Sequence, residues 1–307
     1  MPTIIMPNDS TVLTFLEILS RRILQEYSFM KAGELEPTKI SDATIFGDSS
    51  LDQDLAADRI LGDAVLDFCQ GYDWIRTITI EGRDLIILNE DGLVDLFLDP
   101  LDGSLNWHRD PNGFLFQHGF CATLIKAKQE PCFRDIIGVL GINLSRGIPM
   151  IAVTNSDPLC EMWETHIPVP EPKTPLGLRK DLNFDPGQNL MIWESYYSEM
   201  RVFLSWATKN DHVGKGWLRS PGSAVVEMMA TAMGISSAFV CSMQKMHELG
   251  MGYILVNAHG GVCLNLETGE DLSHHPFNFD SKAPVVLAAN RTIAEKWVKI
   301  YKAFLLR

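Results

Sequence analysis

The chain has 307 residues, of which 46% are hydrophobic and 21% charged, and its formal net charge is −13. This length allows two modest domains, and the composition is that of a globular protein. The negative charge argues against a nucleic-acid-binding surface, which needs clustered Lys and Arg. No apolar run reaches the roughly 18 residues of a membrane span, and residues 1–10 lack the basic start of a signal peptide. We therefore expect a cytoplasmic protein.

Several common functional motifs are missing. The six cysteines form no CxxC pair and no zinc-like spacing, so they are interpreted as buried thiols of a reducing compartment. His247-Glu248 does not continue to HExxH, because Met251 stands at the second histidine position. No Walker loop, GxGxxG or GxSxG occurs. Zinc proteases, nucleotide-binding P-loops and serine hydrolases are thus disfavoured.

Hydrophobic periodicity predicts alternating elements in the first half. Apolar residues at helical spacing predict helices over residues 11–25 and 54–69. A polar segment over residues 31–50 separates them. Residues 85–88 and 93–98, on either side of the turn at 89–92, are interpreted as a hairpin. Further strands are predicted over residues 75–80, 116–126, 136–142 and 149–154. The last three read as an antiparallel meander.

Six prolines between residues 156 and 187 mark a candidate boundary, which divides the chain into residues 1–165 and 185–307. Strands are predicted in the second half over residues 189–193, 236–241, 262–266 and 285–288. Helices are predicted over residues 199–208, 224–233 and 292–306, with an apolar helix from residue 245 that two glycines end at 260 and 261. We therefore expect an α+β half followed by an α/β half.

The most informative stretch is Asp99-Pro100-Leu101-Asp102-Gly103-Ser104, which follows an apolar strand-like run. Pro100 fixes φ and Gly103 permits a backbone conformation that other residues resist, so both carboxylates are held in place. Two aspartates beside the Leu101 carbonyl are the hard oxygen ligands that Mg²⁺ takes. The amides of Gly103 and Ser104 could face an anion at a helix start. The alternative is a solvated turn, because Asp, Pro and Gly all favour turns.

The full hexapeptide resembles the signature of the Mg²⁺-dependent, lithium-sensitive phosphatases, which include inositol monophosphatase and fructose-1,6-bisphosphatase. The resemblance implies that Asp99, Asp102 and the Leu101 carbonyl bind metal. It also implies that Ser104 orients the attacking water. The similarity covers roughly residues 45–265.

The resemblance extends to two acidic residues before the hexapeptide. Asp54, six residues after Asp48, corresponds to the family's carboxylate that activates the attacking water, although the residue taken alone favours a capping or first-turn helix charge. Glu81 lies eighteen residues before Asp99, at about the distance of the family's metal-binding glutamate. The family usually has a Glu-Glu pair there, whereas Gly82 follows Glu81, so the sequence lacks one carboxylate that could bind a third ion.

The second half matches the family at a carboxylate and at a small-residue helix start. Glu248 stands twelve residues before Gly260, as in the family's second motif, and follows the bisphosphatase choice of Glu over Asp. Without the family, the sequence favours a surface charge that compensates the helix dipole at Glu248. When the chain is aligned with the inositol enzymes at Glu248, Lys245 falls where a polar residue contacts the substrate ring. Cys241 falls where those enzymes carry a substrate-binding glutamate. Implied phosphate- or substrate-binding residues are Gly103, Ser104, Gly222, Ser223, Ala224 and Lys245.

The resemblance implies a layered α-β-α-β-α sandwich with the site between an N-terminal half with an antiparallel sheet and a C-terminal α/β half. It further implies two Mg²⁺ ions, held by Glu81, Asp99, Leu101, Asp102 and Glu248, inhibition by Li⁺, and a homodimer or larger assembly. The expected reaction is hydrolysis of a small phosphorylated polyol or sugar. Fructose-1,6-bisphosphatase or nucleotide 3′-phosphatase activity, a nonenzymatic phosphometabolite-binding relative, and an interaction scaffold remain alternatives.

Overall fold

The computed structural model describes residues 4–32, 40–43, 49–104, 106, 117–154, 163–164, 190–193, 198–212, 217–219 and 222–307. The helices are α1 (Asp9–Ala32), α2 (Asp52–Cys69), α4 (Ser198–Lys209), α5 (Ala224–Ala232), α6 (Met246–Ala258) and α7 (Arg291–Leu305). Two 3₁₀ turns, η1 (Phe133–Asp135) and η2 (Leu272–His274), connect strands.

Two larger sheets and a small ribbon contain the strands. The first sheet has the order β4-β3-β5-β6-β7-β8-β9, and the second has the order β11-β10-β12-β14-β13. The first sheet contains β3 (Ile75–Ile80), β4 (Ile86–Ile87), β5 (Val94–Asp102), β6 (Gly119–Lys126), β7 (Ile136–Asn143), β8 (Ile148–Val153) and β9 (Trp163–Glu164). The second sheet contains β10 (Leu190–Trp193), β11 (Trp217–Arg219), β12 (Ala238–Lys245), β13 (Val262–Asn265) and β14 (Lys282–Ala288). The ribbon pairs β1 (Ile40–Ala43) with β2 (Ser49–Leu51).

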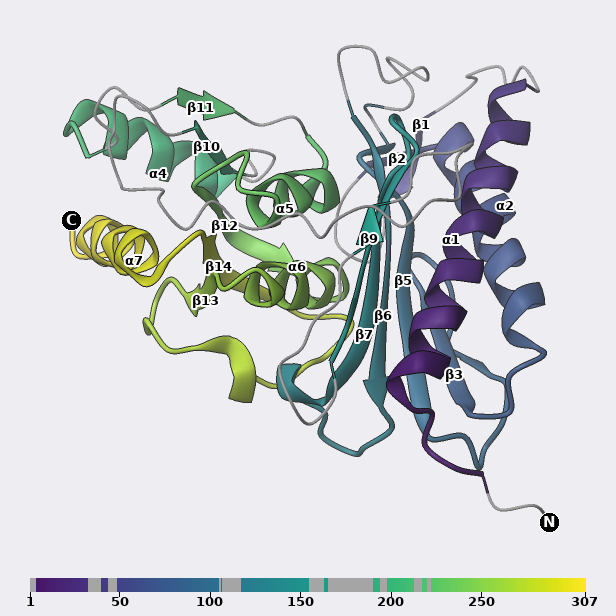
Figure 1. Cartoon of the computed structure of the whole chain (residues 1–307). Coiled ribbons are helices and arrows are strands. Elements are labelled where there is room, and N and C mark those ends of the chain that lie inside the picture. Colours follow the sequence, from purple (N-terminus) through teal and green to yellow (C-terminus); the bar gives the residue numbers. More distant parts are fainter. Residues whose placement is uncertain are drawn as a thin grey trace.

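Helices and sheets alternate in five layers (Figure 1). Helices α1 and α2 cover one face of the first sheet, α5 and α6 lie between the two sheets, and α4 and α7 cover the outer face of the second sheet. Three clusters of buried apolar side chains fill the spaces between these layers. The α-β-α-β-α sandwich that the resemblance implied is therefore confirmed.

The predicted meander is confirmed, because β6, β7 and β8 pair antiparallel in sequence order. The closing helix is also confirmed, with Ile293, Trp297 and Tyr301 buried. In the second sheet, β10 pairs parallel with β11 and β12, whereas β14 runs antiparallel to β12 and β13. The mixed sheet between α5, α6 and α7 agrees with the α/β character expected of the second half.

The predicted hairpin over residues 85–98 is wrong. Strand β4 pairs antiparallel with β3, whereas β5 lies on the other side of β3 and runs parallel to it. The intervening turn folds back onto β3, because the amides of Leu88 and Asn89 both donate to the carbonyl of Arg76. Strand β5 is buried along most of its length and pairs with β3 and β6, whereas the two-residue β4 forms the sheet edge. Burial of β5 thus outweighs the local turn signal.

Strand β5 also extends further than predicted, through the aspartates to Asp102. Its pairing with β6 shifts register between Asp99 and Asp102, where Pro100 lies. A bulge of this kind tolerates a proline, which cannot donate to the ladder. Gly103 then turns the chain with φ +77°, as the sequence predicted.

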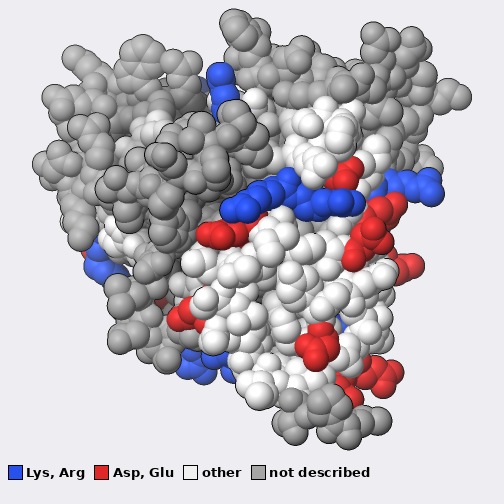
Figure 2. Space-filling view, turned by 45° about the vertical axis from the view of Figure 1, so that its right-hand side comes forward, with Lys and Arg blue, Asp and Glu red and all other residues white. Residues whose placement is uncertain are grey.

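Other predictions lie partly outside the described residues. The boundary over residues 156–187 is described only at Trp163–Glu164, so the division into residues 1–165 and 185–307 stays a prediction. None of the described helices combines the length and apolar character needed to cross a membrane. On the face that Figure 2 shows, basic side chains lie beside acidic ones near the middle of the surface.

Candidate metal and phosphate site

Two parallel strands bring the first two acidic residues together. Strands β3 and β5 run in the same direction, with Ile80 opposite Leu98, so both end at the same edge of the sheet. Glu81 follows β3 directly, and its amide donates to the carbonyl of Leu98 at 3.0 Å. Asp99, the next residue along β5, is buried. The register of the sheet therefore places the carboxylates of Glu81 and Asp99 side by side.

Helix α6 brings Glu248 to the same edge from the second half of the chain. Strand β12 ends at Lys245 and α6 starts at the next residue, so His247 and Glu248 lie in the first helical turn. Both side chains are buried. The hydroxyl of Thr123 on β6 donates to the carbonyl of His247 at 3.4 Å, which ties this turn to the first sheet. The alternative of a surface charge at Glu248 is therefore wrong.

Four side chains converge to form the acidic cluster. Glu81, Asp99, His247 and Glu248 each have one potential ligand atom within 4.8 Å of those of the others. The imidazole Nε2 of His247 lies 3.0 Å from Glu81 Oε2, and the amide of Gln244 donates to Glu248 Oε2. Carboxylates and imidazole are ligands that a divalent cation accepts. The cluster therefore fits a metal ion.

Lys245 also points into this cluster. Its Nζ lies 2.7 Å from Glu81 Oε1 and 3.9 Å from Glu248 Oε1. The side chain is 14% exposed, so this ion pair is largely shielded from water. The resemblance placed Lys245 at a substrate contact. In the structure its ammonium instead contacts two of the proposed metal ligands, and the substrate contact stays a prediction.

The charges shift the pKa values of these groups in opposite directions. Burial raises the pKa of Asp99 well above its usual range, and the carboxylates of Glu81 and Asp102 raise it further. Burial would also raise the pKa of Glu81, but the Lys245 ammonium and His247 outweigh it, so that pKa lies below its ordinary value. Burial acts to lower the pKa of Lys245, but the surrounding carboxylates outweigh this effect and raise that pKa well above its ordinary value. The carboxylates of the cluster thus repel one another, and the Lys245 ammonium compensates part of their negative charge.

Asp102 is directed toward α5. Its Oδ2 accepts hydrogen bonds from the hydroxyl of Ser223 at 2.6 Å and from the amide of Val225 at 2.8 Å. Burial raises the pKa of Asp102, whereas these two hydrogen bonds act to lower it. Ser223 is also the N-cap of α5 and accepts from the amide of Val226 at 3.3 Å. Asp102 therefore connects the first sheet to the start of a helix in the second half, and it is not one of the four converging groups.

Two glycines allow this junction to close. A Cβ on Gly103 would lie 3.0 Å from the carbonyl oxygen of Gly222 and 3.0 Å from the Cβ of Ser223. Gly222 has φ +83°, and its amide donates to Glu227 Oε1 at 3.0 Å. The structure thus brings the expected phosphate-binding residues Gly103, Gly222, Ser223 and Ala224 to one place, with Ser223 and Ala224 buried.

Other predicted site residues occupy varied positions. Leu101 is buried, and its amide donates to Asp99 Oδ1 at 2.9 Å. Ser104 is half-buried just after Gly103. Asp54 lies in α2, but its side chain is outside the described residues, as is Asp48, so the contact between Ser104 and Asp54 stays a prediction. Cys241 is buried within β12, opposite Val285 of β14.

Two members of this site have no counterpart among the predicted site residues. His247 stands out in the sequence only as part of an incomplete HExxH motif, although it precedes Glu248 in the first turn of α6 and so lies close to the same edge. Gln244, which donates to Glu248, was not singled out at all. Gln244 lies in β12, before α6 begins at Met246, so no helical spacing relates it to Glu248 and only the turn from strand to helix brings the two together.

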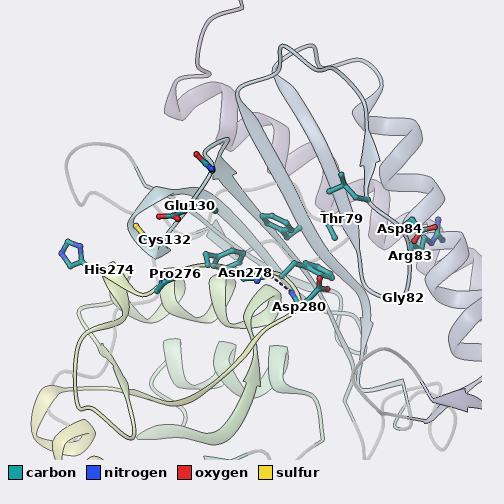
Figure 3. Close-up of a pocket in the computed structure, with 16 residues that line it drawn as sticks. Thr79, Gly82, Arg83, Asp84, Glu130, Cys132, His274, Pro276, Asn278 and Asp280 are labelled. Carbon is teal, nitrogen blue, oxygen red and sulfur yellow. Dashed lines mark hydrogen bonds between the residues drawn. The ribbon is translucent and has the colours of Figure 1, made fainter.

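A pocket of about 1260 Å³ borders the cluster (Figure 3). Gly82, the residue after Glu81, lies on one side with Arg83 and Asp84, and His274 and Cys132 lie on the opposite side. Phe97, Phe277 and Phe279 also line it. The ring of Phe279 stacks on His247 with centroids 4.6 Å apart. Phe279 therefore contacts both the pocket and His247 of the acidic cluster.

No family model matches this sequence, and no curated protein matches it by sequence. Solved structures match over almost the full chain. A putative sedoheptulose-1,7-bisphosphatase from Toxoplasma gondii has a TM-score of 0.70 at 15% identity, with 97% of this chain and 96% of that chain covered. Fructose-1,6-bisphosphatase of Leishmania major has a TM-score of 0.68 at 15% identity, with 97% of this chain and 95% of that chain covered. An IMPase of Thermotoga maritima has a TM-score of 0.65 at 16% identity, with 95% of this chain and 96% of that chain covered.

The chain therefore has the fold of the inositol monophosphatase and fructose-1,6-bisphosphatase superfamily, as the hexapeptide indicated. Identities of 15–16% with members from both branches do not assign it to either one.

Proposed function

We propose that this protein is a metal-dependent phosphomonoesterase that hydrolyses a small phosphorylated polyol or sugar. The observation that carries the proposal is the convergence of Glu81, Asp99 and Glu248 from two strand ends and a helix start. Burying three carboxylates together is costly unless a cation or a proton compensates them. Solved structures that share the fold include IMPases and sugar bisphosphatases.

Asp99 and Glu248 are the principal residues that would hold Mg²⁺, with Glu81, Asp102 and the Leu101 carbonyl beside them. When bound, such an ion lowers the pKa of a water molecule and neutralises charge on the phosphate ester. The backbone after Asp102 would orient the phosphate, because Gly103 and Ser104 follow the metal ligands directly. The hydroxyl of Ser104 would hold the attacking water, with Asp54 as the group that accepts its proton.

The junction with α5 would fix the substrate relative to these groups. Gly103 packs against Gly222 and Ser223, so a phosphate placed over Gly103 lies near the start of α5. The positive end of a helix dipole favours an anion there. Asp102 and Ser223 act as positioning residues in this arrangement, because their hydrogen bond holds the hexapeptide against the helix.

The test is release of phosphate from inositol 1-phosphate, fructose 1,6-bisphosphate and adenosine 3′,5′-bisphosphate. Each substrate is measured with Mg²⁺, with EDTA in place of Mg²⁺, and with Mg²⁺ plus Li⁺. We expect release from at least one substrate that depends on Mg²⁺ and falls with Li⁺. The substrate that is hydrolysed distinguishes the inositol, fructose bisphosphate and nucleotide 3′-phosphate alternatives. Release that is equal in EDTA contradicts the metal-dependent reaction.

A nonenzymatic phosphometabolite-binding relative is the second candidate. The observation that favours it is the contact of both carboxylate oxygens of Glu81 with nitrogen atoms, one from Lys245 and one from His247. A cluster compensated by its own side chains could retain ligand binding without turnover. Calorimetric binding of inositol 1-phosphate or fructose 1,6-bisphosphate, without phosphate release from any of the three esters, would favour this candidate.

A further inference from the structure

The ammonium of Lys245 occupies space between two carboxylates that the fold family would use for metal ions. Its Nζ is 2.7 Å from Glu81 Oε1 and 3.9 Å from Glu248 Oε1. The ammonium therefore supplies positive charge at a position where the resemblance to the phosphatase family implies a divalent cation.

His247 takes the other oxygen of Glu81. The distance from its Nε2 to Glu81 Oε2 is 3.0 Å, and the imidazole is completely buried. The stacked ring of Phe279, inclined by 25° to the imidazole, holds His247 in this orientation. Both oxygens of Glu81 thus face nitrogen atoms of the chain itself, and two neighbouring residues of one segment provide them.

The backbone at Lys245 is held on both sides, so this contact does not depend on a mobile surface side chain. Lys245 pairs with Lys282 across β12 and β14, and α6 begins at the following residue. The side chain is largely buried and reaches across to a residue 164 positions earlier in the chain. Its ion pair is thus part of the packing between the first sheet and α6.

A divalent ion at Glu81 would compete with this ammonium. Mg²⁺ binds oxygen at roughly 2.0–2.1 Å and needs near-octahedral geometry. An ion at Glu81 Oε1 would displace the hydrogen bond from Lys245 and bring two positive charges together. An ion between Asp99 and Glu248 would leave the contact of Lys245 with Glu81 in place, because the ammonium lies 2.7 Å from Glu81 Oε1 but 3.9 Å from Glu248 Oε1.

We propose that Lys245 is a built-in cation that replaces one of the two divalent ions of the site, so that the chain binds one divalent ion between Asp99 and Glu248. This inference rests on the proposed function, because it concerns the same site. It changes the number of ions from the two that the resemblance implied. Glu81 then acts as the anchor of Lys245 and is not a metal ligand.

The direct test counts bound Mn²⁺ at saturation, with inorganic phosphate present, from the loss of the free Mn²⁺ signal in electron paramagnetic resonance. We expect one ion per wild-type chain and two per chain in Lys245→Met, which frees the carboxylate of Glu81. Lys128→Met is the matched control, because Lys128 also pairs with a carboxylate, that of Asp135, beyond the other end of β6. This control should bind one ion. Two ions in the wild type, none in the wild type, or one in Lys245→Met would each overturn the inference.

A second pair of variants keeps the inference testable if Lys245→Met does not fold. Glu81→Gln should still bind one Mn²⁺, whereas Asp99→Asn should bind none. Loss of the ion in Glu81→Gln, or its retention in Asp99→Asn, would overturn the inference. The count is independent of turnover: absence of Mg²⁺-dependent phosphate release would contradict the proposed function, whatever number of ions the chain binds.

Discussion

Asp102 and Ser223, 121 residues apart, are joined by a hydrogen bond of 2.6 Å from the Ser223 hydroxyl to Asp102 Oδ2. The amide of Val225 donates to the same oxygen at 2.8 Å. A carboxylate that accepts two hydrogen bonds at a helix start benefits from the helix dipole as well. This contact fixes how the hexapeptide on β5 lies against α5, and therefore how the two sides of the candidate site are aligned.

Asp102→Asn should abolish turnover and leave the fold intact. The substitution removes one negative charge but little volume, and the amide oxygen can still accept from Val225. We expect kcat to fall by at least about 100-fold, on the order of 3 kcal/mol of transition-state stabilisation. Steady-state phosphate release measures the change, and circular dichroism checks the fold. Turnover equal to that of the wild type would remove Asp102 from the site.

Ser223→Ala should destabilise the protein more than it changes chemistry. The variant loses the N-cap of α5 and leaves half-buried Asp102 with one hydrogen bond fewer. The expected loss is about 1–3 kcal/mol in the free energy of unfolding, since a cap and a hydrogen bond to a charged group are both removed. Urea denaturation measures it. Ser223→Thr, which keeps the hydroxyl, is the control, and an equal loss there would point to packing instead of hydrogen bonding.

Ser104→Ala should lower kcat more than it raises KM. Orientation of the attacking water matters mainly in the transition state, so its loss affects the chemical step and hardly affects substrate binding. We expect a decrease in kcat of about 10²-fold, in the range typical of proton-transfer and positioning groups. Initial rates over a range of substrate concentrations separate the two constants. An unchanged kcat would exclude Ser104 from the mechanism.

Mg²⁺ should stabilise the protein against heat through Glu248. A ligand that binds only the folded state at 100 times its Kd adds about 2.7 kcal/mol of stability. We expect the Tm of the wild type to rise on addition of Mg²⁺ and to return with EDTA. In Glu248→Gln the Mg²⁺-dependent rise should be lost. Differential scanning fluorimetry measures it, and an equal rise in both proteins would place the ion elsewhere.

Asp135 should contribute stability that depends on pH. Burial acts to raise the pKa of Asp135, but the hydrogen bonds from Lys128 and from the amide of Cys132 outweigh it, so the pKa is lowered. A lowered pKa stabilises the folded state above the unfolded pKa of about 3.9, and this contribution disappears as the pH falls through the folded pKa. Asp135→Asn should therefore cost about 1 kcal/mol at pH 7.

The cost of Asp135→Asn should decrease steadily below about pH 4, where the carboxyl of the unfolded chain begins to bind a proton while that of the folded protein stays ionised to lower pH. Urea unfolding of both proteins at a series of pH values measures the difference. If the difference in free energy of unfolding stays constant down to the lowest accessible pH, the charge of Asp135 does not contribute, and the variant is destabilised by the fit of the amide alone.

Much of the local structure was predictable from the sequence. Hydrophobic periodicity locates most helices and strands, since a buried stripe or alternating face leaves its period in the chain. The turn at Gly103 was predictable because few residues other than glycine adopt φ +77° without strain. The hairpin over residues 85–98 was not predictable, because the choice of partner for β5 depends on the burial of both its faces.

The order of the residues is enough to specify the carboxylate-bearing hexapeptide, most helices and strands, and the resemblance to a phosphatase family. The bond between Asp102 and Ser223, the place of His247 in the cluster and the pairing of Lys245 with Glu81 emerge only in the folded chain. These contacts join residues that are far apart in the sequence. Local patterns record short-range hydrogen bonds and the period of burial, whereas a contact between residues 164 positions apart exists only after the sheet register and the position of α6 are fixed together.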